Sequence, residues 1–260
     1  MSAWVAIDSN LHKRMGWRQR QAFEFASTQQ TADVLLPELI SLLPHYTMCF
    51  MQQNDGYILV ALLGLGGDRN LYVNNENYWM CQYVPASLRS YPFTLADNSE
   101  TGEKVFCIEE SHITDDSDAT FFFDNDDNLA NETATVFGFL SQCENSRETT
   151  QKACNALADA GLITPWEINL KQGEKVVPVE GLYSVDEAAL NKLDDEDFLA
   201  VRKAGGLGVA YAQLLSMNQL VVLERLDEIQ GQILAQTANS EAANLTGFSL
   251  GEDEGSLMFE

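Results

Sequence analysis

The stretch of residues 79–93 holds the side chains best suited to bind a ligand, because aromatic rings and one guanidinium are interspersed with two prolines. If a turn of helix begins at Pro85, Leu88 faces the core, and Arg89 can hydrogen-bond backbone carbonyls or an anion. Two interpretations follow: a helical lid fixed to a sheet edge with Arg89 paired internally, or an amphipathic pocket with one fixed positive charge. The candidate binding residues here are Trp79, Tyr83, Arg89, Tyr91 and Phe93.

A carboxylate and a histidine follow at the end of a predicted strand, where Glu109 precedes His112 by three residues. A histidine beside a carboxylate can act as a general base. A loop histidine near a surface acid is far commoner, so the sequence favours no catalytic residue. Glu109 and His112 are instead candidates for binding a ligand or partner. The alternative is an enzyme or small-ligand protein whose pocket joins Glu109 to Arg89 and the aromatic rings.

Other motifs with known chemistry are incomplete. The glycine-rich residues 64–67 lack the third glycine of a dinucleotide fingerprint, because Arg69 stands in its place. The acidic residues 124–128 lack the glycine and glutamate of a calcium loop, because Leu129 and Thr135 stand there. The three histidines show no metal-binding spacing, and the chain has no Gly-x-Ser-x-Gly nucleophile motif. We therefore expect neither a metal nor a cofactor.

The cysteines and the apolar runs indicate a reduced cytoplasmic protein. The cysteine count is odd and no pair has a two-residue gap, which favours free, mostly buried thiols. No continuous apolar run approaches the roughly 18 residues of a membrane span, and no signal peptide is evident. We expect no membrane insertion. The five cysteines are Cys49, Cys81, Cys107, Cys143 and Cys154.

The chain is strongly acidic: its 260 residues include 39 acids and 15 lysines and arginines, giving a formal charge of −24. This charge disfavours unaided binding to nucleic acid or anionic lipid. Residues 91–140 hold twelve acids against Lys104 alone, whereas residues 1–40 are neutral. The acidic block is either a solvated face that keeps the protein soluble or a patch for a basic partner. We expect a protein partner, and a basic surface on that partner would complement the acidic block. The alternative is a small-molecule ligand.

Hydrophobic periodicity divides the chain into a β-rich first half and a helical second half. We expect one α+β domain, in which an antiparallel β-meander sheet packs against C-terminal helices. Ser184 predicts a helix N-cap, with Glu187 completing a capping box. The predicted strands are 46–51, 57–65, 71–73, 78–83, 93–95 and 104–109, with a hairpin at 166–179; the other predicted helices are 32–43, 133–161, 193–206 and 207–234.

Three segments are expected: an irregular N-terminal arm (1–33) with a strand-like piece at 22–26, the α+β domain (34–236) and an acidic flexible tail (237–260). The tail carries Leu257, Met258 and Phe259 beside an acidic cluster. Apolar residues flanked by acids are typical of a short motif that folds on binding a partner. The alternative is that these three residues fold back onto their own domain as an added strand.

Residues Tyr83 to Phe93 read Tyr-Val-Pro-Ala-Ser-Leu-Arg-Ser-Tyr-Pro-Phe. This is the most specific of several segments that, in sequence and in order, resemble the SapC family. The chain departs from the family at Thr47, where the family favours proline, which leaves that edge less rigid. The resemblance spans roughly residues 10–225, and its other segments are His45-Tyr46, 60–65, 70–73, Trp79, 107–111, 156–157, 160–163, 185–187 and 211–217.

The resemblance implies a bacterial protein related by name to a surface-layer locus, without an enzymatic activity that can be transferred. Members tend to occur in Gram-negative bacteria, beside genes for flavin-dependent halogenase-like proteins, cupin-like proteins and TonB-dependent receptors. By association, this implies an accessory role in an uptake or modification system. We therefore expect a non-enzymatic cytoplasmic binding or adaptor protein, with the small-ligand or enzyme interpretation as the alternative.

Overall fold

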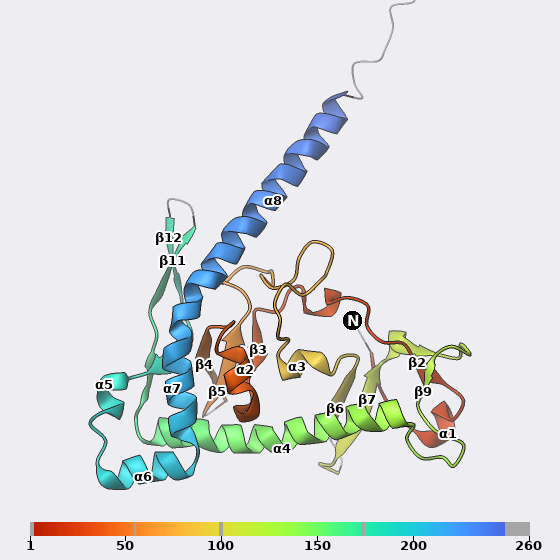
Figure 1. Ribbon diagram of the computed structural model, residues 1–260, viewed down its shortest axis with the longest axis horizontal. Helices are drawn as coiled ribbons and strands as arrows, with labels where there is room; N and C mark the ends of the chain where they lie inside the picture. The colour runs from red at the N-terminus through yellow and green to blue at the C-terminus, as the bar shows by residue number, and fades with distance from the viewer. Residues whose placement is uncertain (1–2, 55, 99–100, 173–174, 248–260) are drawn as a thin grey trace, which may run out of the picture.

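The computed structural model describes residues 3–54, 56–98, 101–172 and 175–247 (Figure 1). Antiparallel sheets and helices alternate along the chain, which confirms the predicted α+β class. The strands are β1 (Trp4–Ala6), β2 (Gly16–Trp17), β3 (Thr31–Asp33), β4 (Met48–Gln53), β5 (Gly56–Leu62), β6 (Phe93–Asp97), β7 (Lys104–Glu109), β8 (Ile113–Thr114), β9 (Thr120–Phe121), β10 (Ile163–Pro165), β11 (Ile168–Gln172), β12 (Lys175–Val179) and β13 (Leu182–Val185). The α-helices are α1 (Ser9–His12), α2 (Leu39–Leu42), α3 (Ala86–Arg89), α4 (Asn131–Asp159), α5 (Glu187–Leu190), α6 (Asp195–Lys203), α7 (Gly206–Ser216) and α8 (Leu220–Gly247). The 3-10 helices are η1 (Glu24–Ala26), η2 (Leu36–Glu38), η3 (Glu110–His112) and η4 (Met217–Gln219).

The larger sheet is built on the hairpin of β4 and β5, whose apolar residues and turn the sequence predicts. Its strand order is β10-β13-β4-β5-β3, and each neighbouring pair is antiparallel. Met48, Cys49 and Phe50 follow one another along β4, and all three are fully buried. Consecutive buried residues are typical of a strand that is covered on both faces. Helices α4 and α7 supply this cover through their contacts with β5 and β4.

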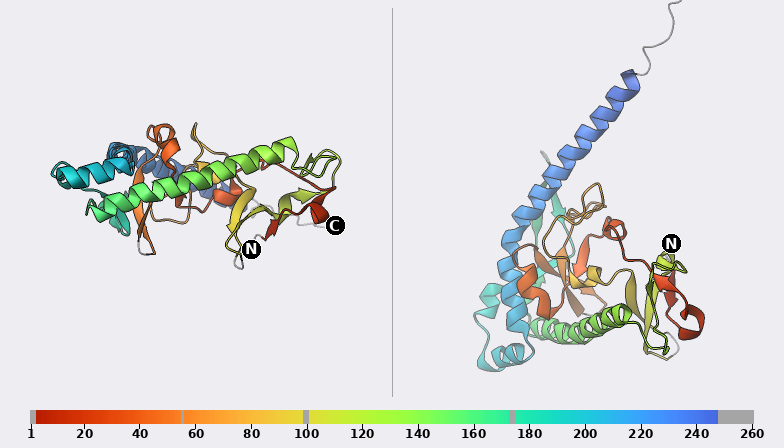
Figure 2. Two further views of the ribbon diagram at one scale, coloured as in Figure 1. Left: turned by 90° about the horizontal axis from the view of Figure 1, so that it is seen from below. Right: turned by 45° about the vertical axis from the view of Figure 1, so that its right-hand side comes forward.

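A second core lies toward the N-terminal end of α4, where the small sheets β1-β7-β6 and β8-β2-β9 meet the helix. Trp17 is buried there, and its Nε1 donates a hydrogen bond to Thr133 Oγ1 at 3.1 Å. Helix α4 has 29 residues and runs beneath both cores (Figure 2). Leu140 packs in the second core, whereas Leu157 packs against the larger sheet. One long helix therefore fixes the two sheet systems to each other.

The predicted meander is wrong beyond its first hairpin. Residues 71–73 and 78–83 form no ladder and contribute only an isolated bridge between Val73 and Trp79. Asn74 Oδ1 accepts hydrogen bonds from two backbone N–H groups of this loop, at 2.8 and 3.0 Å. The loop thus satisfies backbone groups locally, and the aromatic side chains that produced the strand signal pack against the core instead.

The N-terminal arm is also not irregular. Within its described residues, β1 pairs with β7, β2 lies between β8 and β9, and β3 forms an edge of the larger sheet. The strand-like piece at 22–26 is instead the 3-10 helix η1. Each strand of the arm has only two or three residues. Such short strands carry too little alternation to be recognised, and distant partners determine their pairing.

Several helix boundaries differ from the prediction, whereas α4 and the β11–β12 hairpin are confirmed. The helix predicted at 32–43 shrinks to η2 and α2, because β3 takes the first residues into the sheet. Ser184 lies in β13, and Asp186 caps α5 by accepting a hydrogen bond from Ala189 N at 2.9 Å. An aspartate is as good an N-cap as a serine, so the start moves by two residues.

The C-terminal helices form one rod that is interrupted by η4 and leaves the body of the protein (Figure 1). Among the residues of α8 up to 236, whose side chains the structure describes, the last buried one is Gln230, whose Nε2 donates to the carbonyl oxygens of Leu71 at 2.9 Å and Val73 at 3.1 Å. Helix α8 continues through Gly247, into the stretch predicted as a tail from residue 237. The tail motif at Leu257, Met258 and Phe259 lies outside the described residues.

The cysteines differ in burial, which predicts an order of reaction. Burial raises the pKa of Cys49 and of Cys154 to about 12, whereas Cys81 and Cys143 are partly exposed. Because the thiolate is the reactive form, we expect a disulfide-exchange reagent to label Cys81 and Cys143 before Cys49 and Cys154 in native protein. Peptide mapping after short labelling tests the order, and titration of the denatured chain should find all five thiols. Labelling of Cys49 as fast as that of Cys143, or fewer than five thiols, would contradict the prediction.

Candidate functional site

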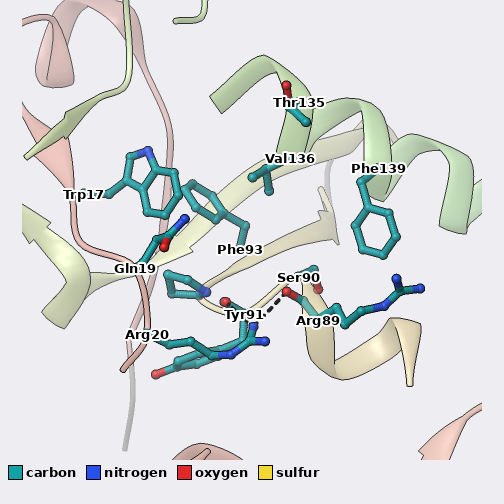
Figure 3. A pocket seen from close by; sticks show the side chains of 11 residues that line it. Trp17, Gln19, Arg20, Arg89, Ser90, Tyr91, Phe93, Thr135, Val136 and Phe139 are labelled. Carbon is teal, nitrogen blue, oxygen red and sulfur yellow. Dashed lines mark hydrogen bonds between the residues drawn. The ribbon is translucent and has the colours of Figure 1, made fainter. Parts of the chain in front are cut away.

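A cavity of about 480 Å³ opens between α3, the N-terminal half of α4 and the segment that follows β2. Figure 3 shows apolar side chains around it, with two arginine side chains across from the indole of Trp17. The volume falls within the range of small-molecule sites. The lining residues that matter below are Trp17, Phe93, Val136, Phe139, Arg20 and Arg89.

Arg89 is held by two aromatic rings. Its guanidinium carbon lies 5.1 Å from the ring centroid of Tyr83 and 5.0 Å from that of Phe139, and its Nη2 donates to Tyr83 Oη at 3.2 Å. Cation–π contacts of this kind occupy the faces of a guanidinium and leave its rim for hydrogen bonds. Among the described residues, no carboxylate oxygen lies within 4.0 Å of an Arg89 nitrogen.

Glu38 lies behind Tyr83 and fixes this arrangement. Its Oε2 accepts hydrogen bonds from Tyr83 Oη at 3.0 Å and Ala86 N at 2.8 Å, and its Oε1 accepts one from Leu35 N at 3.0 Å. Burial raises the pKa of Glu38, and the hydrogen bonds together with the charge of Arg89 offset part of that rise. The Glu38 carboxylate thus positions the phenol that in turn contacts Arg89.

Arg20 closes the other side of the cavity mouth. Its Nη1 donates to the carbonyl oxygens of Arg89 at 2.8 Å and Tyr91 at 3.1 Å, so it caps the C-terminal end of the single-turn helix α3. Its guanidinium carbon lies 4.6 Å from the ring centroid of Phe23, and burial lowers its pKa. Arg20 therefore holds the connection between α3 and β6 in place, which leaves Arg89 as the cation whose rim faces the cavity.

Trp79 does not line the cavity. Its Nε1 donates to Tyr46 Oη at 3.1 Å and to the carbonyl oxygen of Tyr83 at 3.2 Å, and its ring stacks on Tyr72 at 5.9 Å between centroids. These contacts place it in the aromatic packing beneath the loop of residues 74–83. Of the predicted site residues, Arg89, Tyr91 and Phe93 line the cavity, and Tyr83 supports it from behind Arg89.

Glu109 and His112 lie together, but behind the ring of Tyr91. Glu109 is 6% exposed, and its Oε2 accepts hydrogen bonds from Tyr91 Oη at 3.3 Å and from Ser111 Oγ. His112 Nε2 lies 3.8 Å from the same oxygen, and its Nδ1 lies 2.8 Å from the carbonyl oxygen of Arg18. The predicted acid–histidine pair therefore exists as a hydrogen-bonded support for Tyr91, outside the cavity.

A second surface with functional potential runs along α7 and α8. Tyr211, Leu215, Val222 and Ile229 recur at intervals of four and seven residues, which places them on one side of the rod. Their exposed fractions are 49%, 58%, 40% and 41%. We call these four residues the apolar stripe. It lies beside the buried side of α8, where Leu223 contacts the core.

The helical stretch Gly206–Gln236 is long and apolar enough to cross a membrane by length and composition, and its 18-residue apolar window has a mean hydropathy of 1.3. Helix α7, however, is tied to the larger sheet by buried polar contacts. Gln213 and Ser216 are fully buried, and Ser216 Oγ accepts a hydrogen bond from Met48 N at 2.9 Å. A membrane span that includes α7 would have to break those bonds, so α7 packs as a helix held on the core.

Residues 7–223 match the model of the SapC family. The chain belongs to the SapC family. This confirms the family that the sequence predicts. Neither the curated proteins nor the solved structures contain a significant match to the chain.

The region that matches the SapC family contains the whole cavity and the buried carboxylates of Glu38 and Glu109, because all of them lie between Trp17 and Phe139. It ends at residue 223, just inside α8, so most of that helix follows it. The segment of the family resemblance with the most specific sequence, residues 83–93, forms α3 and one wall of the cavity. The segment that most specifically resembles the SapC family therefore lines the cavity.

Four residues that build this SapC-family cavity are absent from the sequence prediction: Trp17, Arg20, Glu38 and Phe139. Arg20 stands in residues 1–40, which are neutral within an acidic chain, and this is a signal that composition offers. Phe139 follows Val136 by three residues, so a helical face could have paired them. Glu38 contacts Leu35 N locally, but its role beside Arg89 depends on donors contributed by residues 83–86.

Proposed function

We propose that this SapC-family protein is a non-enzymatic adaptor of the cytoplasm, accessory to an uptake or modification system, that binds a protein partner along its apolar stripe. The observation that carries the proposal is the exposure of Tyr211 and Leu215 on α7 and of Val222 and Ile229 on α8, the helix that leaves the body. Aligned exposed apolar side chains rimmed by polar residues are typical of interaction sites. Helix-in-groove recognition reads residues at this spacing.

The charge of the chain favours a basic partner over a second copy. Each copy has a formal charge of −24, so self-association brings like charges together. A partner with lysine and arginine around an apolar groove would be attracted from a distance and would then bury the stripe. The location of the protein in the cytoplasm is part of this proposal. So is the link to a surface layer that the family name suggests.

An aspartate placed in the stripe tests the proposal. We expect Leu215→Asp and Ile229→Asp each to reduce capture of the basic partner from native cells at least tenfold, because an unpaired charge would be buried in the interface. The matched control is Ala235→Asp, which adds the same charge to an exposed position on the opposite side of α8. Quantitative mass spectrometry of tagged full-length protein measures the captured partner, and melting curves verify folding.

The outcomes are distinct. Loss of one basic protein with both stripe variants, and its retention with Ala235→Asp, supports the adaptor. Equal capture by all variants contradicts it. Wild-type protein that elutes as a dimer, and stripe variants that elute as monomers, would show that a second copy covers the stripe and would also contradict it.

A further inference from the structure

We infer that the cavity between α3 and α4 binds a small organic anion, an aromatic carboxylate whose carboxylate pairs with Arg89 and whose ring packs against Trp17 and Phe93. This ligand site is separate from the apolar stripe and does not depend on the adaptor function. Both arginines on its wall belong to a chain that has 39 acids and 15 basic residues.

The charge at the cavity is the first argument. Three other arginines, Arg18, Arg69 and Arg147, each have an aspartate carboxylate within 4.0 Å. Arg89 has none within 4.0 Å among the described residues, and neither has Arg20. Glu38 attracts Arg89 electrostatically, but its oxygens are occupied by three other donors. A local positive site within an acidic surface focuses anions at that point.

The geometry of Arg89 is the second argument. The rings of Tyr83 and Phe139 hold its guanidinium at 5.1 and 5.0 Å, and the only hydrogen bond given to a described residue is that of Nη2 to Tyr83 Oη. The remaining N–H groups are available at the rim. A guanidinium fixed in this way can form two parallel hydrogen bonds to a carboxylate, which a lysine cannot do.

The cavity walls opposite Arg89 are apolar and fixed in position. Trp17 is 4% exposed and Phe93 2% exposed, and their rings are 4.7 Å apart between centroids in an edge-to-face arrangement. Their positions are fixed by the second core, and Trp17 is fixed further by Thr133. Val136 extends the apolar surface from α4 (Figure 3). Rigid rings opposite a fixed cation select a ligand with one flat apolar end and one anionic end.

Binding of matched acids and amides tests the inference. Full-length protein is titrated calorimetrically with phenylacetate, 3-phenylpropionate and 4-phenylbutyrate, and with the amide of each acid. We expect at least one acid to bind with one-to-one stoichiometry and its amide to bind at least tenfold more weakly, because the amide keeps the ring and lacks the charge. Binding should also quench tryptophan fluorescence, and Trp17→Phe should reduce that signal.

Variants then locate the site. We expect Arg89→Lys to weaken the best acid at least tenfold and Val136→Trp to abolish binding by filling the cavity. The control Arg225→Lys changes an exposed arginine on α8 and should leave Kd within twofold. The inference is overturned if no acid binds, if acid and amide bind equally, or if folded Arg89→Lys binds like wild type. A lower melting temperature for Arg89→Lys with an unchanged Kd would show that Arg89 serves only to hold α3.

Discussion

Replacing Glu38 with alanine is expected to lower the free energy of unfolding by about 3 kcal/mol. Its side chain is 5% exposed, and three donors depend on it: the N–H groups of Leu35 and Ala86 and the hydroxyl of Tyr83. Each buried donor without a partner costs roughly 1–3 kcal/mol, and water entering the vacated space offsets part of the total. For a chain of this size, the loss corresponds to a fall in Tm of roughly 6–12 °C.

Urea unfolding followed by circular dichroism measures the loss, with Glu76→Ala as the matched control. Glu76 is exposed in the loop before Trp79, so its replacement should change the free energy of unfolding by no more than roughly 0.5 kcal/mol. The prediction fails if Glu38→Ala and Glu76→Ala are equally stable. That result would mean that the contacts between Glu38 and its three donors contribute nothing net to folding.

The pKa of Glu38 adds a pH signature. Burial raises it above its ordinary value of 4.5, so the folded chain holds this proton more tightly than the unfolded chain. The contribution of this raised pKa to the free energy of unfolding is fully present below pH 4.5 and is lost as the pH rises through the raised pKa. Glu38→Gln removes this titration. We therefore expect the free energy of unfolding of wild type, relative to Glu38→Gln, to decrease as the pH is raised from about 5 to 8. An increase would contradict the direction of the shift.

The elements that the sequence predicts well are those whose signal is local. The β4–β5 hairpin has two apolar runs on either side of a turn, and the 29 residues of α4 repeat apolar groups at helical spacing over both cores. Strand pairing between distant segments is different. β1 pairs Trp4 with Glu109, and nothing in three residues identifies that partner. The sequence therefore predicts an irregular arm, although the arm completes three sheets.

The candidate site shows the same division. Residues 83–93 are adjacent in sequence, and their role as a cavity wall around Arg89 was accessible from their composition. The opposite wall comes from the arm and from α4, so it exists only after folding has brought Trp17, Arg20 and Phe139 together. The prediction that Trp79 and Arg89 line the same pocket is wrong, because the side chain of Trp79 points toward Tyr46.

Replacing Gln213 with leucine is expected to lower the free energy of unfolding by about 2–3 kcal/mol. The pairing of β13 with β4 joins Leu182 to Met51 and Tyr183 to Phe50, and the same register would place Val185 opposite Met48. The side-chain amide of Gln213 stands between that pair. It accepts a hydrogen bond from Val185 N at 2.9 Å and donates one to the carbonyl oxygen of Met48 at 3.3 Å. Helix α7 thus supplies the hydrogen bonds at the point where the strands separate.

Leucine and alanine at position 213 separate two contributions. Leucine nearly restores the volume but leaves the N–H of Val185 without its acceptor and the carbonyl of Met48 with only Ser216 Oγ at 3.5 Å, whereas alanine adds a cavity to the same loss. We therefore expect alanine to be less stable than leucine, and leucine less stable than wild type. The control Gln232→Ala removes an exposed glutamine from α8 and should change the free energy of unfolding by no more than roughly 0.5 kcal/mol.

Amide hydrogen exchange of the same variants identifies where the loss occurs. With Gln213→Leu, exchange of Val185 N–H should accelerate at least tenfold more than that of Leu59 N–H in β5, because only the former loses its acceptor. Equal acceleration at both amides would indicate a loss through general packing. A leucine variant as stable as wild type would mean that apolar contacts alone hold α7 on the sheet. Separating α7 from the sheet would then cost less, and a membrane span that includes α7 would be less unfavourable.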